Sequence, residues 1–174
     1  MPPVLVVVGP PGAGKSTVGG LLARRLGVDF RDTDADIETT AGMPVSDIFV
    51  ELGEPTFRDL ERPAVATALA DHDGVLALGG GAILDPGTRA LLRDHTVVFL
   101  DVGLADASRR IGFDASRPLL IGNPRAQWKR QMDVRRAVYE RVADHVVATS
   151  GRTVADVATE VAALVATDRA HPGS

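Results

Sequence analysis

"VLVVVGPPGAGKST", residues 4–17, decides the fold of this chain. Its first five residues are apolar and mostly β-branched, which predicts a strand buried on both faces of a parallel sheet. The rest matches G-x-x-x-x-G-K-[ST], a glycine-rich loop that joins such a strand to a helix and holds phosphates. A glycine-rich turn that merely packs is the less favoured interpretation, because the motif stands in the context that it needs.

The residues of this loop serve phosphate binding in different ways. The helix that follows Gly14 directs its N-terminal amides at the phosphates, Lys15 is expected to reach the β- and γ-phosphates, and the Ser16 hydroxyl can bind Mg²⁺. Lysine occurs only at positions 15 and 129 in this arginine-rich chain, which indicates a specific task for Lys15. The residues expected to bind a nucleotide here are Gly12, Ala13, Gly14, Lys15, Ser16 and Thr17.

Apolar runs and helical patterns alternate along the rest of the chain. Strands are predicted at residues 4–8, 28–32, 75–79, 96–101 and 145–149. Helices are predicted near residues 15–26, 34–41, 46–52, 55–70, 86–94, 104–111, 125–142 and 153–167. This alternation is typical of a three-layer α/β fold with a parallel sheet. Pro63 falls inside the 55–70 pattern, so we expect that helix to kink or restart there.

Length and composition limit the possible classes of protein. The 174 residues predict one domain over 1–168, with a mobile loop near 112–124 and a disordered tail at 169–174. A net charge of −4 argues against binding nucleic-acid backbone, and no apolar run is long enough to span a membrane. The absence of cysteine and of a signal sequence leads us to expect a cytoplasmic protein.

Carboxylates follow the phosphate loop in the stretch "DFRDTDAD", residues 29–36. A magnesium-binding aspartate usually ends an apolar strand, and both Asp32 and Asp101 meet that description. Ligands of open α/β sheets bind at the carboxyl ends of strands, so the pattern leaves both positions open. Asp36 is interpreted as a solvated carboxylate in the first turn of a helix.

Several separate motifs together resemble the shikimate kinase family. In chain order they are "GPPGAGKST", "DTDADIE", "GEPTFRDLE", "LALGGGA", "SRPLL" and "RRAVYE". The resemblance implies a five-stranded parallel sheet with helices on both faces, similar to nucleoside monophosphate kinases. It also implies transfer of the γ-phosphoryl group of ATP to the 3-hydroxyl of shikimate, with Mg²⁺ as cofactor, in chorismate and aromatic amino-acid biosynthesis. We expect a monomer whose partners are ATP and shikimate.

The resemblance also assigns roles around the acceptor. It places Asp32 with Ser16 at the magnesium ion, Asp34 at the hydroxyl group that is phosphorylated, and leaves Asp101 a structural role. Arg58 alone reads as a surface arginine paired with Glu54 or Glu61. The resemblance instead implies that Arg58 and Arg136 bind the substrate carboxylate, with Glu61 holding Arg58. The run of glycines by itself predicts either a flexible turn or a place where a ligand comes close to the backbone. The resemblance implies that Gly79, Gly80 and Gly81 line the shikimate pocket.

Three arginines are implied at the nucleotide. Arg117 alone reads as a solvated loop residue, but "SRPLL" resembles the family's lid motif, which implies that Arg117 reaches the γ-phosphate as a catalytic residue beside Lys15 and Asp34. Arg110 and Arg152 are implied to flank the base, although "TSGRTV" departs from the family pattern around Arg152. Trp128 and Tyr139 are interpreted as packing residues, and the four histidines lack the spacing of metal ligands.

Two other kinases and one protein without catalysis are the alternatives. A gluconate kinase would share the phosphate loop, whereas paired arginines and "LGGG" favour a cyclic carboxylate as the acceptor. An adenylate kinase usually has G-K-G-T where this chain has G-K-S-T. A nucleotide-binding module without catalysis would have little need to retain the following residues together: Lys15, Ser16, Asp32, Asp34, Arg58, Arg117 and Arg136.

Overall fold

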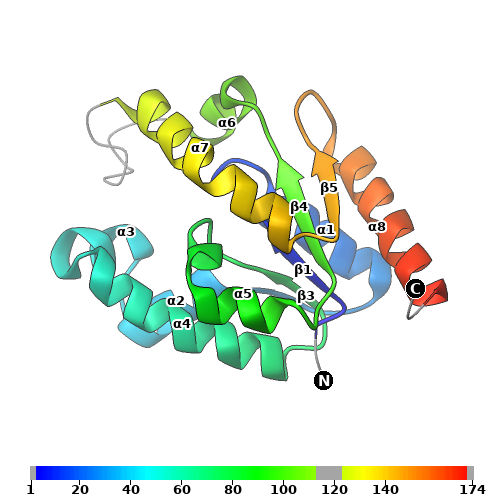
Figure 1. Ribbon diagram of the computed structural model, residues 1–174, viewed down its shortest axis with the longest axis horizontal. Coiled ribbons are helices and arrows are strands. Elements are labelled where there is room, and N and C mark those ends of the chain that lie inside the picture. Colours follow the sequence, from blue (N-terminus) through cyan, green and yellow to red (C-terminus); the bar gives the residue numbers. More distant parts are fainter. Residues whose placement is uncertain (1–2, 113–122, 172–174) are drawn as a thin grey trace.

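Five parallel strands form the centre of the computed structural model, which describes residues 3–112 and 123–171 (Figure 1). In the order in which they lie side by side they are β2 (Phe30–Asp32), β3 (Val75–Ala77), β1 (Leu5–Val8), β4 (Val97–Asp101) and β5 (His145–Ala148). All four pairings are parallel, as predicted. Crossovers between parallel strands are right-handed, and the strand order extends the sheet to both sides of β1, so helices cover both faces of the sheet.

Ten helical segments connect the strands or follow them in the described part of the chain. They are α1 (Lys15–Leu26), α2 (Thr33–Ala41), α3 (Val45–Asp47), the π-helix η1 (Ile48–Leu52), α4 (Glu54–Asp71), the 3₁₀ helix η2 (Ala82–Leu84), α5 (Pro86–Leu92), α6 (Leu104–Ile111), α7 (Pro124–Val142) and α8 (Val154–Ala170). In Figure 1, α1 and α8 pack together, whereas α7 lies along β4.

The three central strands hold the main core. Every residue of β1 and β3 is buried, and so are Val97 to Leu100 of β4, which explains why these strands read as continuous apolar runs. A second, smaller cluster of Ile37, Ile48 and Phe57 joins α2, η1 and α4 beyond the edge of the sheet. This cluster packs α2 against α4 beside the carboxyl end of β2.

The register of the strands brings their carboxyl ends to one edge. Val7 and Asp32 both lie opposite Ala77, and Val8 lies opposite Phe99. The phosphate loop, Asp32, the glycine run and Asp101 therefore follow their strands at the same edge of the sheet. Ligands of open parallel sheets bind at this edge.

Two helices differ from the prediction. Residues 46–52 were expected as one helix, but Val45–Asp47 form a short α-turn that is followed by η1. Gly53 caps η1, and its amide donates a hydrogen bond to the carbonyl of Ile48. The helix α4 continues through Pro63 without restarting. Pro63 and Asp59 are both exposed, so water can satisfy the Asp59 carbonyl that loses its helical donor.

Candidate active site

The phosphate loop has the backbone geometry that its glycines allow. Gly12 and Gly14 adopt φ of 86° and 87°, in the left-handed region that favours glycine. Gly14 caps α1 without a side-chain hydrogen bond, so the first amides of the helix face the loop. The Lys15 ammonium donates to the carbonyls of Gly9 at 2.8 Å and Pro10 at 3.1 Å. This arrangement can bind a phosphate through amides, helix dipole and ammonium together.

A cavity of about 710 Å³ opens over this loop. Its lining includes every described residue that the sequence predicted for ATP: Gly12, Ala13, Gly14, Lys15, Ser16, Thr17, Arg110 and Arg152. Arg117, predicted at the γ-phosphate, lies outside the described residues, as does most of the predicted lid.

The two arginines of this cavity are held by backbone carbonyls. Arg110 donates to the carbonyl of Gly12 at 3.1 Å and to that of Thr149 at 2.9 Å, which ties α6 to the phosphate loop and to the loop after β5. Arg152 donates to the carbonyl of Ala148 at 2.8 Å and pairs with Glu160 at 2.5 Å. Both planar guanidinium groups thus stand at the cavity wall, where a flat base can contact them.

Ser16 and Asp32 form the oxygen pair predicted for Mg²⁺. The Ser16 hydroxyl donates to Asp32 Oδ2 at 3.0 Å, and the other carboxylate oxygen caps α2 by accepting from the Asp34 amide at 2.9 Å. Asp101 lines neither cavity; it pairs with Arg136 at 2.7 Å. The described residues contain no cluster of three or more acidic or histidine side chains that could hold a metal alone. One hydroxyl and one carboxylate fit Mg²⁺, which takes its remaining ligands from phosphates and water.

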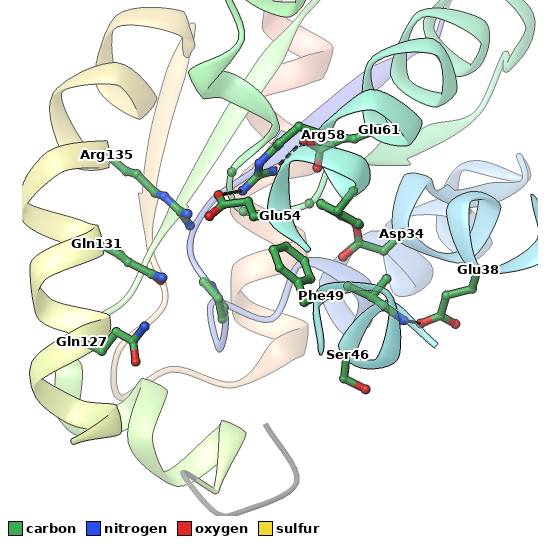
Figure 2. Close-up of a pocket in the computed structure, with 16 residues that line it drawn as sticks. Asp34, Glu38, Ser46, Phe49, Glu54, Arg58, Glu61, Gln127, Gln131 and Arg135 are labelled. Atoms are coloured by element: carbon green, nitrogen blue, oxygen red, sulfur yellow. Dashed lines mark hydrogen bonds and ion pairs between the residues drawn. The ribbon is translucent and has the colours of Figure 1, made fainter. Parts of the chain in front are cut away.

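A second cavity of about 500 Å³ adjoins the first (Figure 2). Pro11, Asp34 and Gly80 line both cavities, so a molecule in one lies next to a molecule in the other. Figure 2 shows the side chains of α2 and α4 on one side and those of α7 on the other. The polar and charged side chains in the lining are Asp34, Glu38, Ser46, Glu54, Arg58, Glu61, Gln127, Gln131 and Arg135.

Two carboxylates hold Arg58 in this cavity. Its guanidinium donates to Glu61 Oε1 at 2.6 Å and to Glu54 Oε1 at 3.3 Å. Glu61 is 3% exposed, and its Oε2 accepts no hydrogen bond within the described part of the chain. Burial raises the pKa of Glu61, while the charge of Arg58 opposes the shift. Arg58 thus keeps a fixed direction and can still offer donors to an anion in the cavity.

The second arginine of the cavity is Arg135, not the predicted Arg136. Arg135 lines the cavity together with Gln131 and Gln127, four and eight residues before it on α7, whereas the guanidinium of Arg136 turns to Asp101. Residues four apart share a helix face, so the neighbouring position 136 must face elsewhere. The uncharged polar residues at 127 and 131 were the available signal for this face, because they stand beside the buried Trp128 and Met132.

Asp34 has the features of a general base. It is half-buried, and its Oδ1 is fully buried without a hydrogen-bond donor in residues 3–112 or 123–171. Burial, followed by the charge of Asp32, raises the pKa of Asp34 to about 6, while Lys15 opposes the shift. A carboxylate with a pKa near the working pH can accept a proton from a hydroxyl group in the adjoining cavity.

The glycine run lets side chains, as well as a ligand, come close to the backbone. None of the three glycines has a positive φ, so their backbone angles do not require glycine. A Cβ at Gly79 would stand 2.6 Å from Asp34 Oδ1, and one at Gly81 would collide with the guanidinium of Arg58. At Gly80 the nearest atoms are Pro11 Cδ at 3.3 Å and Arg135 Nη1 at 3.4 Å. The run therefore provides space for three functional side chains.

The chain resembles known proteins over nearly its whole length. A family model described as shikimate kinase matches residues 11–166. A shikimate kinase of Salinispora arenicola is 60% identical over 166 residues, which cover 95% of this chain and 99% of that protein. The structure of a shikimate kinase from Acinetobacter baumannii in complex with shikimate superimposes with a TM-score of 0.91 at 33% identity and covers 97% of this chain and 95% of that one.

A more distant likeness concerns the fold alone. A gluconokinase from Sinorhizobium meliloti has a TM-score of 0.57 at 21% identity and covers 95% of this chain and 93% of that one. No helix within the described ranges has both the length and the apolar character needed to cross a membrane.

Proposed function

Since this chain belongs to the shikimate kinase family, we propose that its two adjoining cavities bind ATP and shikimate and that it transfers the γ-phosphoryl group to the 3-hydroxyl of shikimate. The single observation that carries this assignment is the shared wall of Pro11, Asp34 and Gly80. It brings a base from the acceptor side next to the phosphate loop.

The acceptor's carboxylate is assigned to Arg58 and Arg135. Both are cationic, both line the same cavity, and guanidinium groups bind carboxylates through paired hydrogen bonds. Arg135 takes the role expected for Arg136, because the latter lies at Asp101. Gly79, Gly80 and Gly81 complete the pocket wall, where their missing side chains leave room for the ring and for the groups that grip it.

In the proposed reaction, Asp34 orients the acceptor hydroxyl and takes its proton as the oxygen attacks the γ-phosphorus. The bond between that phosphorus and the β-γ bridging oxygen breaks, so the products are shikimate 3-phosphate and ADP. Lys15 and the first amides of α1 stabilise the charge on the transferred group. Ser16 and Asp32 would hold Mg²⁺, which supplies further neutralisation of phosphate charge when bound. The resemblance of "SRPLL" alone supports a similar contact for Arg117, outside the described residues.

The test is a coupled assay of ADP release with ATP, Mg²⁺ and a panel of hydroxy acids. We expect turnover with shikimate and none above background with gluconate. Lys15→Met serves as the matched inactive control, and we expect it to reduce turnover at least about a hundredfold without altering thermal unfolding. Gluconate phosphorylation, or ADP release that ignores the acceptor, would refute the proposal. Sedimentation equilibrium tests the further proposal that the protein is a monomer.

A further inference from the structure

Tyr139 is completely buried although it carries a polar group. It stands on α7, four residues after Arg135, and its ring stacks on Phe99 of β4 with centroids 4.9 Å apart. Packing alone, as the sequence suggested, would be met equally well by phenylalanine. The hydroxyl group therefore needs its own explanation, because a buried polar group is retained only where it has partners.

The hydroxyl of Tyr139 lies at the wall of the acceptor cavity. It donates a hydrogen bond to the carbonyl of Gly80, and the guanidinium of Arg135 approaches the same glycine, with its Nη1 3.4 Å from the position of a Cβ there. Burial raises the pKa of Tyr139 to about 12, although the charge of Arg135 opposes the shift. The group consequently keeps its proton at neutral pH, and it can act as donor and acceptor at once.

These contacts fix two parts of the cavity relative to each other. Gly80 lies between Gly79, which leaves space for Asp34, and Gly81, which leaves space for Arg58. Arg135 approaches Gly80 from α7. The stack on Phe99 anchors the ring to the central sheet. The hydroxyl thus links the rigid core to the glycine run at the place where the guanidinium of Arg135 approaches it.

We propose that Tyr139 is a positioning residue that sets the direction of Arg135, and through it the affinity and selectivity for an acceptor that carries a carboxylate. It touches neither substrate nor nucleotide in this scheme, since it lines neither cavity. The inference rests on the proposed function, because it takes the carboxylate of shikimate as the ligand of Arg135.

Tyr139→Phe tests the inference, since it removes one oxygen atom and keeps the stack. We expect the KM for shikimate to rise about tenfold, as for the weakening of a charge-assisted hydrogen bond, with the KM for ATP and kcat changed less than about twofold. Met132→Ala is the control: Met132 is buried on the same helix and lines neither cavity, so its loss should lower thermal stability and leave both KM values unchanged.

A second arm uses the neutral carboxamide of shikimate as acceptor. Wild type and Tyr139→Phe should have the same KM for this analogue, because the carboxylate that Arg135 binds is absent. In an Arg135→Met background, Tyr139→Phe should add no further increase in the KM for shikimate, since both changes affect one interaction. ADP titration confirms that each variant is folded.

The outcomes separate this inference from the proposed function. If wild type phosphorylates shikimate but Tyr139→Phe leaves its KM unchanged, or raises the KM for the carboxamide equally, the positioning role is refuted and the function stands. If wild type fails to phosphorylate shikimate, the proposed function fails first. An equal rise in both KM values in Tyr139→Phe and Met132→Ala would reduce Tyr139 to a packing residue.

Discussion

The carboxylate of Asp34, the proposed general base, lies where its negative charge weakens the fold. Its Oδ1 is buried without a donor in the described structure, and the charge of Asp32 stands close by. The pKa is raised from 3.8 to about 6, so the folded chain binds more protons than the unfolded chain between these values. Stability therefore falls as the pH rises through this window and remains lower above it.

Asp34→Asn should accordingly stabilise the free protein and abolish most of its activity. At pH 7.5 we expect a gain in the free energy of unfolding of about 1–3 kcal/mol, most of which disappears near pH 3.5, where the wild-type carboxyl is largely protonated in both states. The loss of the base should lower kcat about 10²- to 10⁴-fold. Urea unfolding at several pH values and steady-state kinetics measure the two effects, and a gain that is equal at both pH values would contradict the electrostatic origin.

In wild type the same group should set the acid limb of the activity profile. Asp34 accepts a proton only as the carboxylate, so kcat/KM for shikimate should increase with pH through about 6 and then level off. This expectation refers to the free enzyme, which is the state that kcat/KM reports.

Asp32 and Asp101 differ in their partners, and this difference predicts their response to magnesium. Asp32 accepts from Ser16 in the nucleotide cavity, whereas Asp101 is neutralised by Arg136 outside it. Asp32→Ala should raise the Mg²⁺ concentration for half-maximal activity at least about tenfold, since a carboxylate ligand is lost. Asp101→Ala, the matched control, should leave it unchanged. Magnesium titrations at fixed ATP measure both, and the reverse order would move the metal to Asp101.

At the scale of elements, the two ends of the glycine run lie beside different residues of the acceptor cavity: the proposed base at one end and an arginine at the other. A methyl group at Gly79 meets the Asp34 carboxylate, and one at Gly81 meets the Arg58 guanidinium. Both obstacles are the ends of side chains, which can swing aside without disturbing the backbone. The expected damage therefore falls on function more than on stability.

Gly79→Ala should lower kcat about 10- to 100-fold, because a displacement of about 1 Å is sufficient to disturb a catalytic group. Gly81→Ala should instead raise the KM for shikimate about tenfold by moving a charge-assisted contact. Gly80→Ala meets neighbours only at 3.3 Å or more and should have the mildest effect of the three. Kinetics with both substrates separate the effects; identical defects in all three variants would mean that only flexibility of the run matters.

The helix α4 contains an internal proline, Pro63, which does not belong to the buried face of the helix. Pro63 is exposed, within a continuous helix of 18 residues whose opposite face packs through Phe57, Val65 and Leu69. Pro63→Ala restores the amide that can bond to the Asp59 carbonyl, and we expect a gain of about 1–2 kcal/mol after the greater freedom of the unfolded chain is subtracted.

Pro55 provides the control for this change. It occupies the first turn of the same helix, where no amide hydrogen bond is lost, so Pro55→Ala should not stabilise the protein. Urea unfolding of both variants gives the comparison. If the two changes have equal effects, the missing hydrogen bond at Pro63 is not the cause.

For the whole molecule, the sequence predicted the architecture and named several of the residues that line the two cavities. Apolar runs such as Val4–Val8 identify central strands because burial on both faces leaves no room for polar residues. The phosphate loop was predictable since its geometry depends on a contiguous motif. Arg135 was missed, because a shift of one residue on a helix turns a side chain into or away from a cavity, and that direction depends on how α7 packs. The π-turn at Ile48–Leu52 had no local signal, since packing against Phe57 selects it.

The strand order also has a consequence for how this chain reaches its structure. β1 precedes all other strands, yet its two neighbours are distant in sequence: Leu5 lies opposite Val75, and Val6 lies opposite Val97. During synthesis, its apolar side chains and both rows of unpaired amides and carbonyls stay exposed while about 70 more residues emerge. "VLVVV" is thus open to intermolecular pairing in the nascent chain, and we expect chaperones to be needed until β4 pairs with the second edge of β1.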